Sequence, residues 1–258
     1  LITILINPFM SCGARLPVFV LLAGVFFPSH AGTVLFSLYL LGILVAVVTA
    51  KLLRRFLFRK DDTPFVMELP PYRVPTARSV LRHMWERAAM YLRKMGGLIL
   101  VASVCVWFLS YFPRHEDTAV QQRESYIGRV GRFTEPLVEP LGLNWKASVA
   151  LLTGAVAKEV TVSTLGVLYA GGEGEGDAAV LSQRLAEVDP RTGVSDFNKA
   201  NALAFLVFVL LYFPCLASLV AIKQEAGGWK WAGFSFVYNT TVAWIVAFVV
   251  YRIALWLI

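Results

Sequence analysis

The sequence predicts an all-α integral membrane protein with about six membrane segments, several of them broken by proline or polar residues. Of its 258 residues, 57% are hydrophobic and only 16% are charged, whereas a soluble domain carries about 25% charge. The mean hydropathy is +0.64. Apolar runs recur that are long enough, or nearly so, to cross a hydrocarbon core of roughly 30 Å. These runs cover residues 1–27, 31–50, 96–112, 146–170, 201–222 and 231–257.

The positive charge of the chain indicates a lipid partner and not nucleic acid. The formal net charge is +7, but eleven of the 24 Lys and Arg residues lie between Lys51 and Lys94, directly beside membrane segments. This is the positive-inside pattern, in which anionic headgroups supply the counter-charge. We therefore expect a bilayer around the protein and a cytoplasmic position for this basic stretch. Because the chain begins with Leu1 inside an apolar run, we also expect it to be a piece of a longer polypeptide.

The basic stretch divides the chain into three parts. Residues 1–60 form the first part, and residues 61–95 a Pro-rich strap followed by an amphipathic helix over 76–95. That helix is expected to lie along the headgroups until the chain turns inward at Gly96-Gly97. Residues 96–258 form the third part, which includes an acidic loop at 171–200. Whether segment 146–170 spans the membrane or re-enters is left open by the sequence.

The segment 7–17 carries the strongest functional signal. It places a cysteine, a thioether, polar side chains and an arginine between two prolines, near the middle of an apolar run. At that depth, polar groups and free carbonyls persist only where they face protein, water or a substrate. The segment reads Asn7-Pro8-Phe9-Met10-Ser11-Cys12-Gly13-Ala14-Arg15-Leu16-Pro17.

Two further polar interruptions lie near the middle of later segments, at Lys158-Glu159 and at Pro214-Cys215. Proline removes a helical hydrogen bond and frees a carbonyl about one turn earlier, and discontinuous helices build binding sites in membrane transporters. Cys12, Glu159 and Cys215 could therefore meet at one depth.

The chemistry of these residues favours transient binding of a transition metal. Thiolate and thioether ligands select softer or borderline ions, whereas Mg²⁺ and Ca²⁺ prefer oxygen. The candidate metal-contacting residues are Cys12, Cys215, Glu159, Met10, Asn7 and Ser11. The alternative is that the cysteines are small buried hydrophobes and the prolines simple kinks. Arg15 is expected to be structural, holding carbonyls at a broken helix end, and we expect no stably bound cofactor.

Catalytic signals are missing from the sequence. It contains no phosphate-binding G-x-x-x-x-G-K-[ST] loop, no G-x-S-x-G elbow and no H-E-x-x-H zinc motif. We therefore expect a membrane protein that is not an enzyme.

The 7–17 motif resembles the signature of the FeoB-type ferrous iron transporters. The resemblance continues through residues 87–107, Ala157-Lys158-Glu159-Val160 with Ser163-Thr164-Leu165-Gly166, Phe213-Pro214-Cys215 and Gly228-Trp229-Lys230-Trp231. It implies the later part of the membrane domain, with the central conserved segment at 1–60 and a second Gate (nucleoside-recognition-like) unit beyond about residue 80.

The resemblance also implies function and partners. Such proteins carry Fe²⁺ across the bacterial inner membrane as multi-pass proteins, with GTP bound by a G domain that this chain lacks together with a first Gate unit. This chain would thus form half of a permease, with Fe²⁺ as the transported ion and GTP acting only through the absent domain. Expected partners are those two domains, small cytoplasmic Feo accessory proteins and further copies of the chain in a homo-oligomer. The resemblance carries a role in the metal path onto Cys12 and Cys215, and onto Glu159.

Two alternatives stay open at this point. The chain could transport another solute such as a nucleoside, which would require aromatic and amide groups around a base. It could also be a non-transporting membrane scaffold, in which the basic helix 76–95 would be the essential surface.

Overall fold

The computed structural model describes residues 1–57, 76–114, 118–170, 185 and 197–257, and this part of the chain contains helices and loops without a β-strand. The predicted all-α class is therefore confirmed. The helices are α1 (Ile2–Ile6), α2 (Leu16–Phe26), α3 (Ala31–Phe56), α4 (Ala77–Tyr111), α5 (Thr118–Glu124), α6 (Tyr126–Val138), α7 (Trp145–Val156), α8 (Val160–Ala170), α10 (Lys199–Leu211), α11 (Leu216–Glu225) and α12 (Trp229–Leu257). Short 3-10 turns are η1 (Asn7–Phe9), η2 (Gly13–Arg15) and η3 (Glu139–Leu141).

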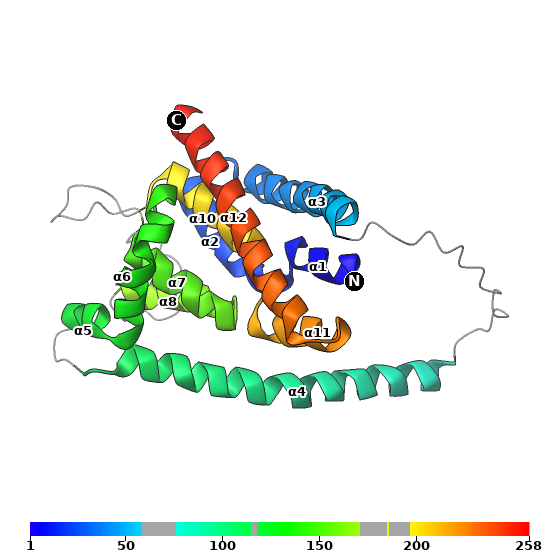
Figure 1. Ribbon diagram of the computed structural model, residues 1–258. Coiled ribbons are helices and arrows are strands. Elements are labelled where there is room, and N and C mark those ends of the chain that lie inside the picture. Colours follow the sequence, from blue (N-terminus) through cyan, green and yellow to red (C-terminus); the bar gives the residue numbers. More distant parts are fainter. Residues whose placement is uncertain (58–75, 115–117, 171–184, 186–196, 258) are drawn as a thin grey trace.

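Four helical segments of the described chain are long and apolar enough to cross a membrane, namely Ile2–Phe26, Ala31–Phe56, Lys199–Glu225 and Trp229–Trp256. The first and third are broken, as the polar interruptions predicted. Helices α1 and α2 both pack on α3, and helices α10 and α11 both pack on α12 (Figure 1). Each break therefore interrupts a segment that continues along the same neighbouring helix.

Helix α10 forms the centre of the core. Its side chains from Ala204 to Leu211 are all buried, and it packs against α12, α2 and α3. The helix begins at a capping box, in which the Asn198 side chain accepts from the Asn201 backbone N–H and the Asn201 side chain accepts from that of Asn198. It ends just before Pro214, which disfavours a helical conformation at the preceding residue. Pro214 thus determines where helix α10 ends.

Segment 146–170 forms a helical hairpin and not a single spanning helix. Helices α7 and α8 pack against each other, and the hydroxyls of Thr153 and Thr164 lie 2.9 Å apart across the pair. With 12 and 11 residues, each helix extends about 17 Å, roughly half the thickness of a bilayer core. The hairpin geometry therefore fits the re-entrant alternative, with its tip at residues 157–159.

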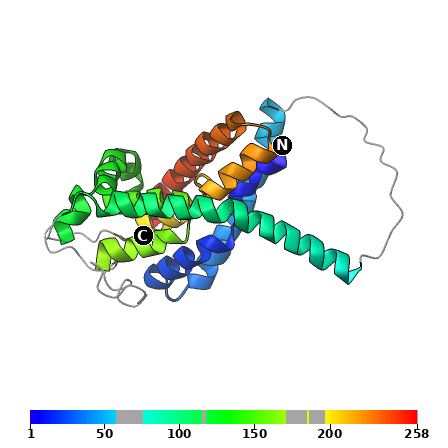
Figure 2. The ribbon, with the colours of Figure 1, turned by 90° about the horizontal axis from the view of Figure 1, so that it is seen from below.

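Helix α4 corrects the prediction of an interfacial helix that ends at Gly96-Gly97. It runs without interruption over 35 residues, because two glycines cost only about 1 kcal/mol each and strong helix formers flank them. Its C-terminal half lies along α6, α7 and α11, while its N-terminal part extends beyond the other helices (Figures 1 and 2).

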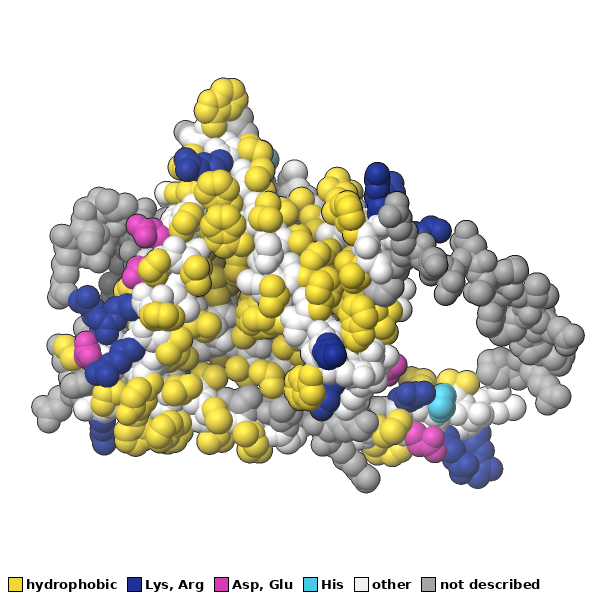
Figure 3. Space-filling model, in the orientation of Figure 1, with side chains coloured by type: hydrophobic (Ala, Val, Ile, Leu, Met, Phe, Trp, Pro, Cys, Tyr) yellow, Lys and Arg dark blue, Asp and Glu magenta, His cyan; other side chains and the backbone are white. Residues whose placement is uncertain are grey.

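The distribution of side chains follows this arrangement. Hydrophobic side chains cover the central helices and one half of α4, and Lys and Arg gather at its far end (Figure 3). The exposed basic residues there include Arg78, Arg82 and Arg87. The predicted strap at 61–75 and most of the acidic loop at 171–200 lie outside the described residues.

The close packing at the hairpin yields a first prediction. A Cβ on Gly154 would overlap the Thr161 hydroxyl and lie 2.6 Å from the Tyr212 hydroxyl oxygen. We expect Gly154→Ala to destabilise the protein by about 1–3 kcal/mol through overpacking. The readout is the temperature at which the detergent-solubilised protein loses its monodisperse size-exclusion peak.

Gly24→Ala is the matched control for this measurement. Gly24 also lies within a helix, α2, but a Cβ there would meet no atom within 4 Å. We expect equal or slightly higher stability for this variant, since alanine is the better helix former. Equal melting of both variants and the wild type would contradict the close packing at Gly154.

Candidate functional site

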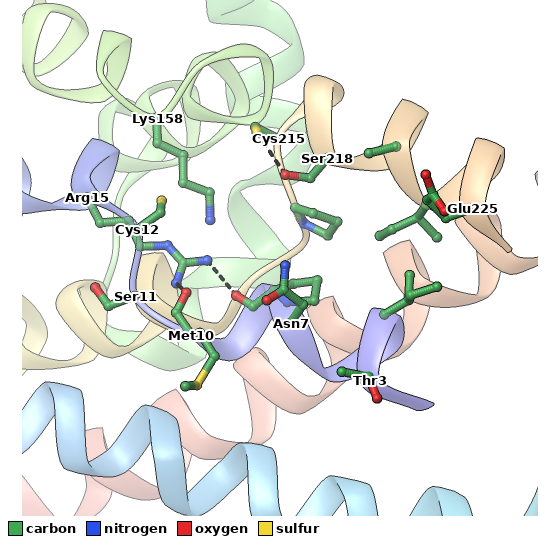
Figure 4. Close-up of a pocket in the computed structure, with 15 residues that line it drawn as sticks. Thr3, Asn7, Met10, Ser11, Cys12, Arg15, Lys158, Cys215, Ser218 and Glu225 are labelled. Atoms are coloured by element: carbon green, nitrogen blue, oxygen red, sulfur yellow. Dashed lines mark hydrogen bonds between the residues drawn. The ribbon is translucent and has the colours of Figure 1, made fainter. Parts of the chain in front are cut away.

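The three predicted interruptions meet at one pocket of about 460 Å³. The first break contributes Asn7, Met10, Ser11, Cys12 and Arg15, the second contributes Lys158, and the third contributes Pro214, Cys215 and Ser218 (Figure 4). The pocket is also lined by Thr3, Ile4, Pro8, Ala221, Ile222 and Glu225. Two broken helices and the tip of a hairpin thus open onto the same space.

Both cysteines of the pocket occupy the same kind of backbone position. Cys12 is the N-cap of η2, which leads directly into α2, and Cys215 is the N-cap of α11. Each has an extended conformation, with ψ near 160°. Cys12 is exposed, and Cys215 is half-buried with its Sγ 3.3 Å from the Ser218 hydroxyl. The two thiols therefore lie at the N-terminal ends of half-helices, where negative charge is favoured.

Arg15 holds the first break together. Its guanidinium donates to the carbonyl of Pro8 at 2.8 Å and to that of Met10 at 3.1 Å. The side chain is only 2% exposed. These carbonyls precede the point where the chain leaves its helical path, so they have no helical donor of their own. The prediction that Arg15 holds carbonyls at a broken helix end is confirmed.

The hairpin tip turns Lys158 inward and Glu159 outward. Lys158 is buried, with its ammonium 4.3 Å from the ring centroid of Tyr212, and it lines the pocket together with Arg15, Cys12 and Cys215. Glu159 is exposed and does not line the pocket. The expected meeting of Cys12, Cys215 and Glu159 is therefore not seen, because adjacent residues at the tip point to opposite sides. A role for Glu159 as a ligand elsewhere stays a prediction.

The remaining candidate ligands lie around the two cysteines at different orientations. Asn7, Ser11 and Met10 all line the pocket, but the thioether of Met10 points away from both cysteines (Figure 4). The described residues contain no cluster of three or more His, Cys, Asp or Glu side chains that could hold a metal ion. Two thiols, with the neutral side chains of Asn7 and Ser11 as further candidate ligands, can coordinate an ion only partially, so the pocket is suited to brief contact and not to storage.

The sequence did not predict the pocket residues Ser218, Ile222 and Glu225. They share one face of α11 with the predicted Cys215, at spacings of three and four residues. That spacing was available in the sequence and could have identified the face. The inward direction of Lys158 had no comparable signal, since it depends on how the hairpin packs.

The fold and the pocket define an integral membrane protein of the class built from discontinuous helices. Comparison with known families gives its particular membership. The family described as "Ferrous iron transport protein B C terminus" matches residues 35–87, and the Gate family, described as "Nucleoside recognition", matches residues 92–229, more than half of the chain. The chain belongs to the FeoB family and corresponds to a C-terminal part of its membrane region.

Curated relatives agree with this assignment. The chain is 50% identical to the "Fe(2+) transport protein A/Fe(2+) transporter FeoB fusion protein" of Porphyromonas gingivalis, over 99% of the chain and 34% of that protein. It is 43% identical to the Fe(2+) transporter FeoB of Campylobacter jejuni, over 98% of the chain and 42% of the relative. It is 38% identical to the Fe(2+) transporter FeoB of Methanocaldococcus jannaschii, over 97% of the chain and 36% of the relative. The chain thus spans between a third and about two-fifths of these relatives. No solved structure matched it.

The contacts of Arg15 generate a second prediction. In Arg15→Met, two buried carbonyls lose their donor, and we expect a loss of about 2–4 kcal/mol in the free energy of unfolding. The change is measured as a lower temperature at which the detergent-solubilised protein loses its monodisperse size-exclusion peak.

Two variants serve as references for Arg15→Met. Arg15→Lys, which keeps the charge but cannot donate through two fixed N–H groups, should fall between Arg15→Met and the wild type. Arg252→Met removes an exposed arginine over the Phe248 ring and should be close to neutral. Wild-type stability for Arg15→Met would show that the carbonyls are satisfied without it.

Proposed function

We propose that this chain is part of a permease that moves ferrous iron across the bacterial inner membrane into the cytoplasm. The relatives described above, which are named as Fe(2+) transporters, support this substrate. Because the chain spans less than half of these proteins, the rest of the permease would come from other parts of the polypeptide. We expect these to include a first Gate unit and a GTP-binding domain, with any GTPase activity confined to the latter.

A small Feo accessory protein is the proposed soluble partner. The relative from Porphyromonas gingivalis joins a transport protein A and a FeoB transporter in one polypeptide. Proteins that are fused in one organism commonly act together, which supports a cytoplasmic partner for the present chain as well.

The observation that carries the proposal is the pairing of Cys12 and Cys215 at one pocket between broken helices. Thiolate sulfur suits a borderline divalent ion such as Fe²⁺, and metal binding requires the deprotonated form. Two half-helix N-termini favour that negative charge. Asn7 and Ser11 can add weak oxygen contacts. Such partial coordination permits release, which conduction requires.

The pocket offers little to a nucleoside. A base is usually held by stacking on an aromatic ring, and no aromatic side chain lines the pocket among the described residues. The nearby Tyr212 ring is covered by the Lys158 ammonium. The pocket chemistry therefore favours a metal ion over the alternative that the word "nucleoside" in the family description raises.

Uptake of radioactive iron(II) by cells that express the complete protein tests the proposal. We expect Cys12→Ser and Cys215→Ser each to lower the initial rate about tenfold or more, because serine replaces a soft ligand by a hard one. Excess uridine should leave the wild-type rate unchanged.

Cys105→Ser is the matched control, since Cys105 is exposed on α4 and lies outside the pocket. Its uptake should equal that of the wild type at equal expression. Glu159→Gln measures whether the carboxylate contributes separately from the pocket. Normal uptake in both pocket cysteine variants would refute the assigned site, and a rate that uridine suppresses would favour the nucleoside alternative.

A further inference from the structure

The pocket continues from the two cysteines toward one end of the bundle as a groove between two half-helices. Helices α1 and α11 pack against each other and form opposite walls of this part of the pocket (Figure 4). The wall from α1 contains Thr3, Ile4 and Asn7, and the wall from α11 contains Ser218, Ala221, Ile222 and Glu225. In both walls, residues three and four positions apart share one face of their helix.

The groove leads from the middle of the membrane-capable segment to its end. Cys215 is the N-cap of α11, and Glu225 is the last residue both of α11 and of the segment Lys199–Glu225. With 10 residues, α11 extends about 15 Å, which is half of a hydrocarbon core of roughly 30 Å. Thr3 and Glu225 are exposed and lie at the opposite end of the pocket from Cys12 (Figure 4). The pocket therefore opens where α11 turns into α12.

This opening lies at the basic end of the bundle. Lys223 and Lys230 flank the turn that follows α11. The end of α3 that carries Arg54 and Arg55 lies at the same end of the bundle (Figures 1 and 2). Basic residues beside membrane segments are typical of the cytoplasmic side. In a protein that imports an ion, this groove would be the exit.

Glu225 is the one carboxylate among the described residues that line the pocket. It forms no ion pair within the part of the chain that the structure describes. Its place in the last turn of α11 is unfavourable for the helix, because the C-terminal end of a helix carries a partial negative charge. Helix stability therefore does not account for a carboxylate at this position, whereas the attraction of a passing cation does.

The chemistry of the lining side chains changes along the groove. The sulfurs of Cys12 and Cys215 lie at its deep end, the amide of Asn7 and the hydroxyl of Ser218 lie further out, and Glu225 lies at the mouth (Figure 4). Sulfur is a soft ligand, whereas carboxylate oxygen belongs with water among the hard ligands. An ion that moves outward would exchange sulfur for oxygen before it meets the cytoplasmic water. Weak contacts at several successive sites are what conduction requires.

We propose that Glu225 is the exit ligand of the pocket, which receives the metal ion from the two cysteines and releases it into the cytoplasm. The proposal rests on the proposed function, since it assumes that the ion reaches Cys12 and Cys215 and moves inward. A negative charge at the mouth lowers the barrier between the sulfurs and water in both directions. It changes the tightness of binding at the sulfurs very little, because it lies about 15 Å away along α11, beyond the screening length of physiological salt.

Stopped-flow absorption with cobalt(II) on the purified complete protein tests this role, because cobalt–thiolate coordination absorbs visible light. Cys12→Ser and Cys215→Ser define the signal that belongs to the pocket. Mixing with cobalt gives the association rate, mixing the loaded protein with a chelator gives the dissociation rate, and titration gives the equilibrium affinity.

We expect Glu225→Gln to lower both rates about tenfold at low salt, because the charge that attracts the ion to the mouth is lost. The equilibrium affinity should stay within about twofold of the wild type, since the sulfurs are unchanged. Glu225→Asp keeps the charge and should retain most of both rates. A purely structural role of Glu225 would not change the two rates together at constant affinity.

Glu139→Gln is the matched control. Glu139 is also exposed, but it lies on η3, which packs against α12, and it does not line the pocket. Both rates should equal those of the wild type. Glu225→Gln should melt at the same temperature as the wild type or higher, since it removes a negative charge from a helix C-terminus.

The possible failures are distinguishable. A thiolate signal with unchanged rates in Glu225→Gln would overturn the exit ligand and leave the proposed function intact. A Glu225→Gln variant with about tenfold weaker equilibrium affinity would place the carboxylate in the same site as the sulfurs and would also overturn the exit role. A wild type without any thiolate signal would overturn the assigned cysteine site, and the exit ligand with it.

Discussion

The structure depends on satisfying the backbone where its apolar helices are broken. Inside a membrane, each unpaired carbonyl costs several kcal/mol, so an open backbone persists only where the protein supplies donors. At the first break Arg15 supplies them to Pro8 and Met10. This contact holds the chain in an extended conformation at Cys12 and lets α2 begin anew at Leu16. The exposed cysteine is therefore a consequence of a buried arginine.

The same solution introduces positive charge into the site of a proposed cation path. An arginine that donates to neutral carbonyls keeps its positive charge. Sulfur suits such a place better than a carboxylate does. A carboxylate would form a strong permanent ion pair with Arg15 or Lys158, whereas a thiol can be neutral, or ionised when a metal is present. Cysteine is thus consistent with a site that must be negative only while a metal ion is present.

The two breaks that contain proline, at residues 7–17 and 214–215, could be predicted from the sequence. The break at the hairpin tip contains no proline, and its geometry could not be predicted in the same way. Pro8, Pro17 and Pro214 restrict local backbone conformation, so their effect is readable without knowing the fold. The hairpin tip at residues 157–159 contains neither proline nor glycine. Its polar pair indicated an interruption, but the inward turn of Lys158 and the outward turn of Glu159 follow from the packing of α7 on α8. A long-range arrangement of this kind is not encoded in local residue types.

Helix α4 is a second case in which local residue types did not determine the structure. Gly96-Gly97 was expected to end an interfacial helix, yet the helix formers on both sides outweigh the cost of two glycines. Its contacts with α6, α7 and α11 hold the apolar half in place. Glycine permits a turn but does not impose one, and only proline or competing hydrogen bonds would have done so.

The positions of the basic residues agree with the positive-inside tendency. The turn between α11 and α12 is flanked by Lys223 and Lys230. That turn lies at the same end of the bundle as the basic end of α3, with Arg54 and Arg55 (Figures 1 and 2). Helices that gather Lys and Arg at one end form one basic face, which anionic headgroups can pair with.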